Sequence, residues 1–129
     1  MKNNNIRIIV LSMLFLLVIG SLGLSGCSKK SPPEPVENIS LRFGYDDKEV
    51  IYIEATWDPV KDAEGYYASI KSTIDDYEYF IMKTDTETVF SDLAYDTVYT
   101  ITVTALILDW RGNQIYSEPT SAEIRTNEP

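Results

Sequence analysis

Apolar and polar side chains alternate with a period of two residues along most of this chain, and this pattern limits its fold more than any other feature. In residues 50–57 (VIYIEATW), Ile51, Ile53 and Ala55 share one face with the tryptophan that follows them. In residues 97–106 (TVYTITVTAL), threonines occupy most of the second face. Because successive side chains of a strand point to opposite faces, this alternation predicts half-buried strands rather than helices.

Turn-forming stretches rich in Gly, Asp and Asn separate the alternating runs. The expected strands are 38–43, 50–57, 65–74, 77–83, 88–90, 97–108 and 115–125. Seven short strands in about 90 residues predict an all-β sandwich of two sheets. The residues expected in its core are Ile39, Leu41, Ile51, Ile53, Ala55, Trp57, Tyr66, Ala68, Ile70, Leu93, Tyr99, Ile101, Val103 and Ala105.

The N-terminal segment has a different composition from the rest of the chain. Residues 1–7 contain Lys2 and Arg7, and residues 8–24 are nearly all apolar. A basic region followed by an apolar run and small residues predicts a secretory signal. The 17 residues of 8–24 are also close to the shortest length that spans a bilayer, so an uncleaved anchor is the alternative.

The only cysteine of the chain ends this segment in the sequence Leu24-Ser25-Gly26-Cys27. This motif resembles the lipobox of bacterial lipoproteins. The resemblance implies that the thiol of Cys27 receives a diacylglyceryl group and that a signal peptide, residues 1–26, is removed before it. The protein would then be anchored to the cell membrane by this lipid, on the extracytoplasmic side. The alternative is an ordinary unmodified thiol after a membrane helix.

Residues 27–37 are expected to connect the lipid to the sandwich as a linker. Three prolines in SKKSPPEPVE favour an extended polyproline path. The sandwich is expected to occupy residues 38–126.

Several residues resemble the pattern of fibronectin type III domains over 35–126. Trp57 is followed by DPVKDAEGYY, LAYDTVY separates Leu93 and Tyr99 by six positions, and a Ser-x-Pro lies in YSEPTSAEIRT. The resemblance implies an immunoglobulin-like, seven-stranded sandwich. It also implies that the tryptophan fills the core, and that Leu93 and Tyr99 form a corner in which the phenol bonds to nearby backbone.

Charge and composition exclude several functions. The net charge of −9 becomes −11 once Lys2 and Arg7 leave with the signal, which argues against nucleic acid as a partner. With no histidine and with its one cysteine assigned to lipid, the chain lacks a Ser-His-Asp or Cys-His arrangement. We therefore expect no enzymatic activity, and no cofactor besides the lipid on Cys27.

Acidic residues gather in three predicted turns, which the resemblance places at one end of the sandwich. They are Asp46, Asp47, Glu49, Asp75, Asp76, Asp92 and Asp96. Three interpretations are open: solvated turn formers, a charged end that is repelled by the envelope, or a weak Ca²⁺ site.

The turn DWRGNQ, residues 109–114, holds the candidate contact residues Trp110, Arg111 and Asn113. Tryptophan and arginine are enriched at interaction hot spots, and the resemblance implies that this loop often carries recognition. In YEYF, residues 77–80, either the two tyrosines or the glutamate and phenylalanine face outward. We expect a lipid-anchored binding or spacer module that contacts an envelope protein. The alternative is an accessory lipoprotein that contacts a glycan through exposed tryptophan and tyrosine.

Overall fold

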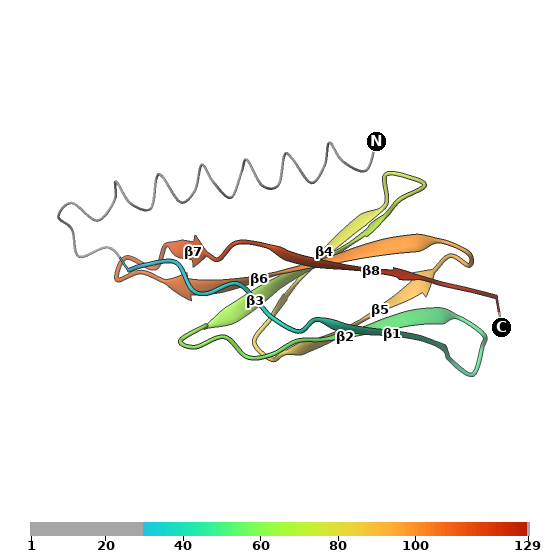
Figure 1. Ribbon diagram of the computed structural model, residues 1–129, viewed down its shortest axis with the longest axis horizontal. Coiled ribbons are helices and arrows are strands. Elements are labelled where there is room, and N and C mark those ends of the chain that lie inside the picture. The colour runs from blue at the N-terminus through green and yellow to red at the C-terminus, as the bar shows by residue number, and fades with distance from the viewer. Residues whose placement is uncertain (1–29, 129) are drawn as a thin grey trace. The chain divides into compact units, whose positions relative to one another are not determined.

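Eight strands form two antiparallel sheets in the computed structural model, within the residues that it describes, 30–128 (Figure 1). The strands are β1 (Ser40–Tyr45), β2 (Ile51–Thr56), β3 (Gly65–Ser72), β4 (Glu78–Lys83), β5 (Glu87–Leu93), β6 (Val98–Leu108), β7 (Gln114–Tyr116) and β8 (Thr120–Arg125). The predicted signal segment 1–26 and Cys27 lie outside the described residues.

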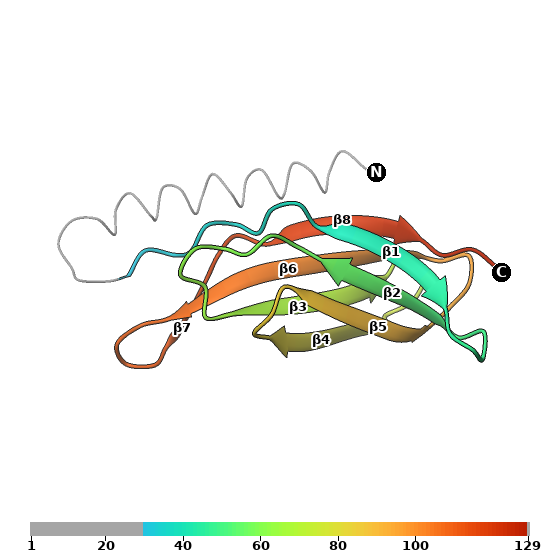
Figure 2. The same ribbon diagram turned by 90° about the horizontal axis from the view of Figure 1, so that it is seen from below.

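One sheet has the order β1-β2-β5, and the other has the order β4-β3-β6, with β7 and β8 both paired to β6. Figure 2 shows the two sheets stacked face to face. The fold is thus the all-β sandwich of two sheets that the alternation predicts. No helix in residues 30–128 is long and apolar enough to cross a membrane.

The core lies between the sheets and follows the predicted faces. In β2 and β6, every second side chain from Ile51 and from Tyr99 is buried. All predicted core residues are buried except Ile39 and Leu41, which are partly buried and pack against the core. Phe90 and Val36 join the same core, although the alternation did not assign them to it.

The last predicted strand, 115–125, is divided into β7 and β8 in the structure. The break falls at Ser117, whose N–H donates to the Ala105 carbonyl at 2.9 Å while its hydroxyl accepts from the Ala105 N–H at 2.9 Å. Pro119 follows and has no N–H for a ladder bond, so regular pairing resumes only at Thr120. The prediction of a single strand over 115–125 is therefore wrong, because the chain forms two strands here.

The end of the predicted linker belongs to the sandwich. Val36 is only 1% exposed, and its carbonyl accepts a hydrogen bond from the Thr120 hydroxyl at 2.7 Å. The Glu37 carbonyl accepts from the Asp58 N–H at 3.1 Å. Val36 and Glu37, two residues of the predicted linker 27–37, are thus held by hydrogen bonds to the sandwich. Val36 is also buried, because its apolar side chain packs in the core.

Candidate functional site

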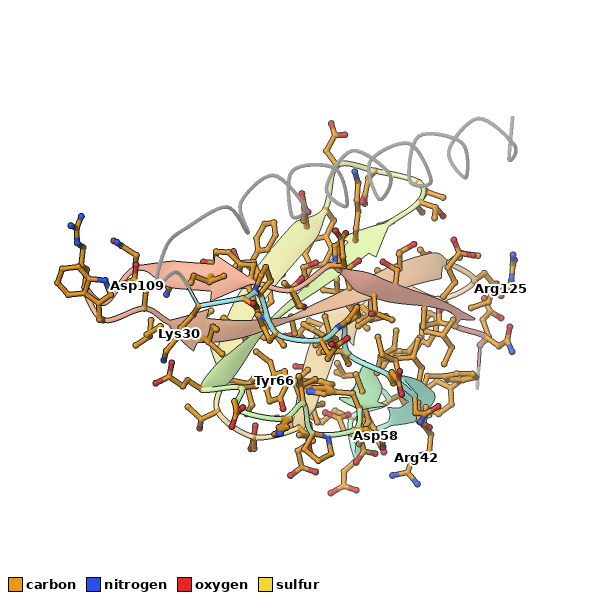
Figure 3. The ribbon with its side chains drawn as sticks, turned by 60° about the vertical axis from the view of Figure 1, so that its left-hand side comes forward. Lys30, Arg42, Asp58, Tyr66, Asp109 and Arg125 are labelled. Carbon is orange, nitrogen blue, oxygen red and sulfur yellow. The ribbon has the colours of Figure 1, made fainter. Side chains whose placement is uncertain are left out.

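The loop 109–114 connects β6 to β7 at one end of the sandwich, and Figure 3 labels Asp109 there. One carboxylate oxygen of Asp109 accepts from the N–H groups of Arg111 and Asn113, each at 2.8 Å. The other accepts from the side-chain amide of Asn113 at 3.1 Å. The bond from the Asn113 N–H is the main reason that the pKa of Asp109 is lowered from its ordinary value. The hydrogen bonds that Asp109 accepts therefore hold the loop in its conformation.

Two further residues hold the loop shape. Gly112 has a φ of 82°, a left-handed conformation that glycine adopts without strain. Asn113 donates its side-chain amide to Asp109, so this predicted contact residue is engaged within the loop. The pattern of the sequence signalled a tight turn here, but it did not reveal that Asp109 and Asn113 bind each other.

Trp110 and Arg111 form the exposed tip of the loop, and we call them the tip pair. Trp110 is 78% exposed, so it extends into solvent rather than folding back on the sandwich. The Arg111 guanidinium carbon lies 4.5 Å from the centre of the indole ring, which is the geometry of a cation–π contact. The loop thus presents an apolar ring and a positive charge side by side.

The opposite end of the sandwich carries the acidic turns between β1 and β2, β3 and β4, and β5 and β6, as Figures 1 and 2 show. The Asp46 carboxylate accepts from the N–H groups of Lys48 and Val50, and that of Asp75 accepts from the Tyr77 N–H. Such local bonds favour the interpretation of these acids as turn formers. Within residues 30–128, no group of three acidic residues is placed to share a metal ion.

A second exposed apolar surface lies on the outer side of β3 and β4, and we call Tyr67, Phe80 and Met82 the aromatic face. The rings of Tyr67 and Phe80 lie 5.4 Å apart, and Phe80 and Met82 are nearly half exposed. Phe80 pairs with Ser69 on the outer face of the ladder. This register answers the question left open for residues 77–80, because it turns the glutamate and phenylalanine outward.

The neighbouring Tyr79 belongs to the inner side of β4. It pairs with the buried Ile70, and its ring contacts that of Phe90 edge-on at 6.4 Å. It is nevertheless 50% exposed, because β4 is the last strand of its sheet and little covers its far side. Alternation alone does not show this, since it assigns faces but not sheet edges.

Comparison with known proteins identifies the fold of this chain. No protein-family model matches the chain, and no curated protein does. Among solved structures, a computationally redesigned β-sandwich protein is 24% identical, with a TM-score of 0.58 over 74% of this chain and 96% of that one. The fibronectin type III domain of human collagen alpha-1(XX) chain is also 24% identical, with a TM-score of 0.57 over 82% and 93%. The FN5 domain of Drosophila Lar is 19% identical, with a TM-score of 0.55 over 75% and 99%.

These similarities establish that the chain has the fold of fibronectin type III domains. At such identities they concern the fold alone.

Proposed function

We propose that this chain is a lipid-anchored contact or spacer module on the extracytoplasmic side of a membrane. It is held by lipid on Cys27, and it meets a protein of the cell envelope without catalysing a reaction. The segment 1–27 and its lipobox-like ending support the anchor. The fibronectin type III fold and the lack of histidine support a role in contact rather than in catalysis.

The observation that carries the contact role is the aromatic face. Exposed aromatic and methionine side chains are enriched where proteins meet one another. Phe80 and Met82 are nearly half exposed, although the core between the sheets is already closed by other residues. Their exposure therefore serves no evident purpose in folding, and a protein partner would remove them from water.

The free edge of β4 supports the same surface. The Ser72 N–H donates to the Tyr77 carbonyl, which fixes the alternation of bonded and non-bonded pairs along β3 and β4. The backbone groups of Glu78, Phe80 and Met82 therefore point away from β3. An extended segment of a partner can pair with such an edge while its side chains meet the aromatic face.

A photo-crosslinking residue placed at Phe80 in the full-length chain tests the proposal in intact cells. The matched control places it at Val89, which is 57% exposed on β5, in the other sheet. We expect position 80 to capture one envelope protein that position 89 does not. Equal adducts at both positions, or none, would contradict a protein contact at this surface.

A further inference from the structure

The chain enters the sandwich at the same end as the 109–114 loop. Glu34 and Pro35 line a surface hollow together with Lys61 of the β2–β3 connection. At the end of this connection, the Glu64 N–H donates to the Leu106 carbonyl near the end of β6, at 2.9 Å. Figures 1 and 2 both show the start of the coloured chain at the end of the sandwich where β6 is connected to β7.

Chain length limits how far a lipid on Cys27 can lie from this end. Pro32 comes five positions after Cys27, and such a stretch spans at most about 18 Å. β6 has 11 residues and runs from the acidic end to the loop, which corresponds to about 36 Å. A membrane that holds Cys27 is therefore much closer to the 109–114 loop than to the acidic turns.

The chemistry of the loop suits such a surface. Tryptophan settles in the headgroup layer of bilayers, and a guanidinium binds phosphate with charge-assisted hydrogen bonds. The Asp109 carboxylate faces the N–H groups of its own loop, so the side chains at the tip are an indole and a cation. The acidic turns at the other end carry the charge that anionic lipid repels.

We infer that Trp110 and Arg111 dock on the anionic lipid surface to which the chain is anchored. This contact holds the sandwich with its acidic end directed away from the lipid. The inference rests on the proposed anchoring at Cys27. The sequence alone indicated that this loop contacts a protein partner. We assign the loop to a lipid contact instead, because it lies at the end of the sandwich where the chain enters from Cys27.

The test uses the protein that cells produce from the full-length chain, placed in vesicles of phosphatidylglycerol and phosphatidylethanolamine with brominated or unbrominated acyl chains. Wild-type emission minus that of Trp110→Phe isolates Trp110, since Trp57 is buried and is common to both proteins. We expect the Trp110 emission to shift to the blue and to be quenched by the brominated lipid. Arg111→Gln, or vesicles of neutral phosphatidylcholine, should weaken both effects. Unshifted and unquenched emission overturns the inference.

Flotation of the same sample with the vesicles separates the two proposals. If the protein floats but Trp110 is not quenched, the anchor stands and the tip contact fails. If the protein does not float, the anchor fails and the tip contact that depends on it fails too. A crosslinker at position 110 that captures a protein in cells instead of lipid also overturns the inference.

Discussion

The backbone N–H of Ala94 donates a hydrogen bond to the hydroxyl of Tyr99 at 2.8 Å. The Tyr99 ring is buried in the core, at 3% exposure, and the hydroxyl reaches the turn that connects β5 to β6. The neighbouring Leu93 is buried at the end of β5. A single side chain thus joins the core to the turn, in the arrangement that the resemblance to fibronectin type III domains implied.

Tyr99→Phe should lower the free energy of unfolding by about 1–2 kcal/mol, because it removes the acceptor of the Ala94 N–H while keeping the ring. Urea unfolding measures this loss. Tyr95→Phe is the matched control, since the Tyr95 hydroxyl bonds to the Glu49 carbonyl at an exposed site. It should change stability by less than about 0.5 kcal/mol. Equal losses in both variants would contradict a special role for Tyr99.

Trp57→Ala should be among the most damaging core changes, with a loss of about 3–5 kcal/mol in the free energy of unfolding. The indole is 4% exposed and contacts the ring of Tyr66 edge-on at 5.6 Å. Its Nε1–H has no acceptor among the described residues, so Trp57→Phe loses no hydrogen bond and should cost less. Thermal unfolding of these variants beside the exposed Trp110→Ala, which should be near neutral, ranks the three effects. If Trp110→Ala were the most destabilising of the three variants, the role of Trp57 in the core would be contradicted.

The alternating pattern was sufficient to predict the sheets because burial on one face of a strand is a local property of sequence. It did not predict Val36 as a core residue. The acceptor role of that residue depends on Thr120, which is 84 positions away. Nor did it predict that the last strand is broken, because the break depends on how Ser117 meets Ala105 across the sheet.

Thr126 shows the same limit at the other end of the domain. The pattern ends the last strand at 125, yet Thr126 is fully buried. Its hydroxyl donates to the Ala94 carbonyl at 2.6 Å and accepts from the Thr97 N–H at 3.1 Å. The residues around Thr126 in the sequence do not distinguish a buried, hydrogen-bonded threonine from one that is exposed to solvent.

Thr126→Val should therefore destabilise the domain by about 1–3 kcal/mol, since it keeps the shape but leaves two backbone groups without their partner. Chemical denaturation measures the change. Thr102→Val is the control, because the Thr102 hydroxyl hydrogen-bonds to the Ser121 hydroxyl on the exposed face of the sheet. We expect a near-neutral effect for this control. A neutral Thr126→Val would show that the C-terminal end is not held through this hydroxyl.

The candidate contact residues were predictable by type but not by role. Trp110 and Arg111 were identified because such residues at a loop tip are typical of interfaces. Their stacking on each other and the hydrogen bond of Asn113 to Asp109 depend on the three-dimensional course of the loop, which the sequence pattern does not reveal. For residues 77–80 the sequence allows either pair of side chains to face outward, because the segment has an aromatic side chain on each side of the strand.

Asp109→Asn should loosen the 109–114 loop in a way that depends on pH. The pKa of Asp109 is lowered in the folded chain, mainly by the Asn113 N–H, so its carboxylate stabilises the fold at neutral pH. This contribution is present above the ordinary pKa of an aspartate and is lost as the pH falls through the lowered folded pKa. The difference in melting temperature between wild type and variant should thus shrink in acid. A difference that is constant with pH or grows in acid would contradict the role of the charge.

The most direct test of the central proposal is the intact mass of the protein extracted from membranes of the cells that produce it. We predict a chain that begins at Cys27 and carries a covalently attached lipid. Cys27→Ser should remove the lipid mass and retain the segment 1–26. A protein recovered with an unmodified thiol at Cys27, or with residues 1–26 still attached in the wild type, would contradict lipid anchoring and the membrane contact of Trp110 that depends on it.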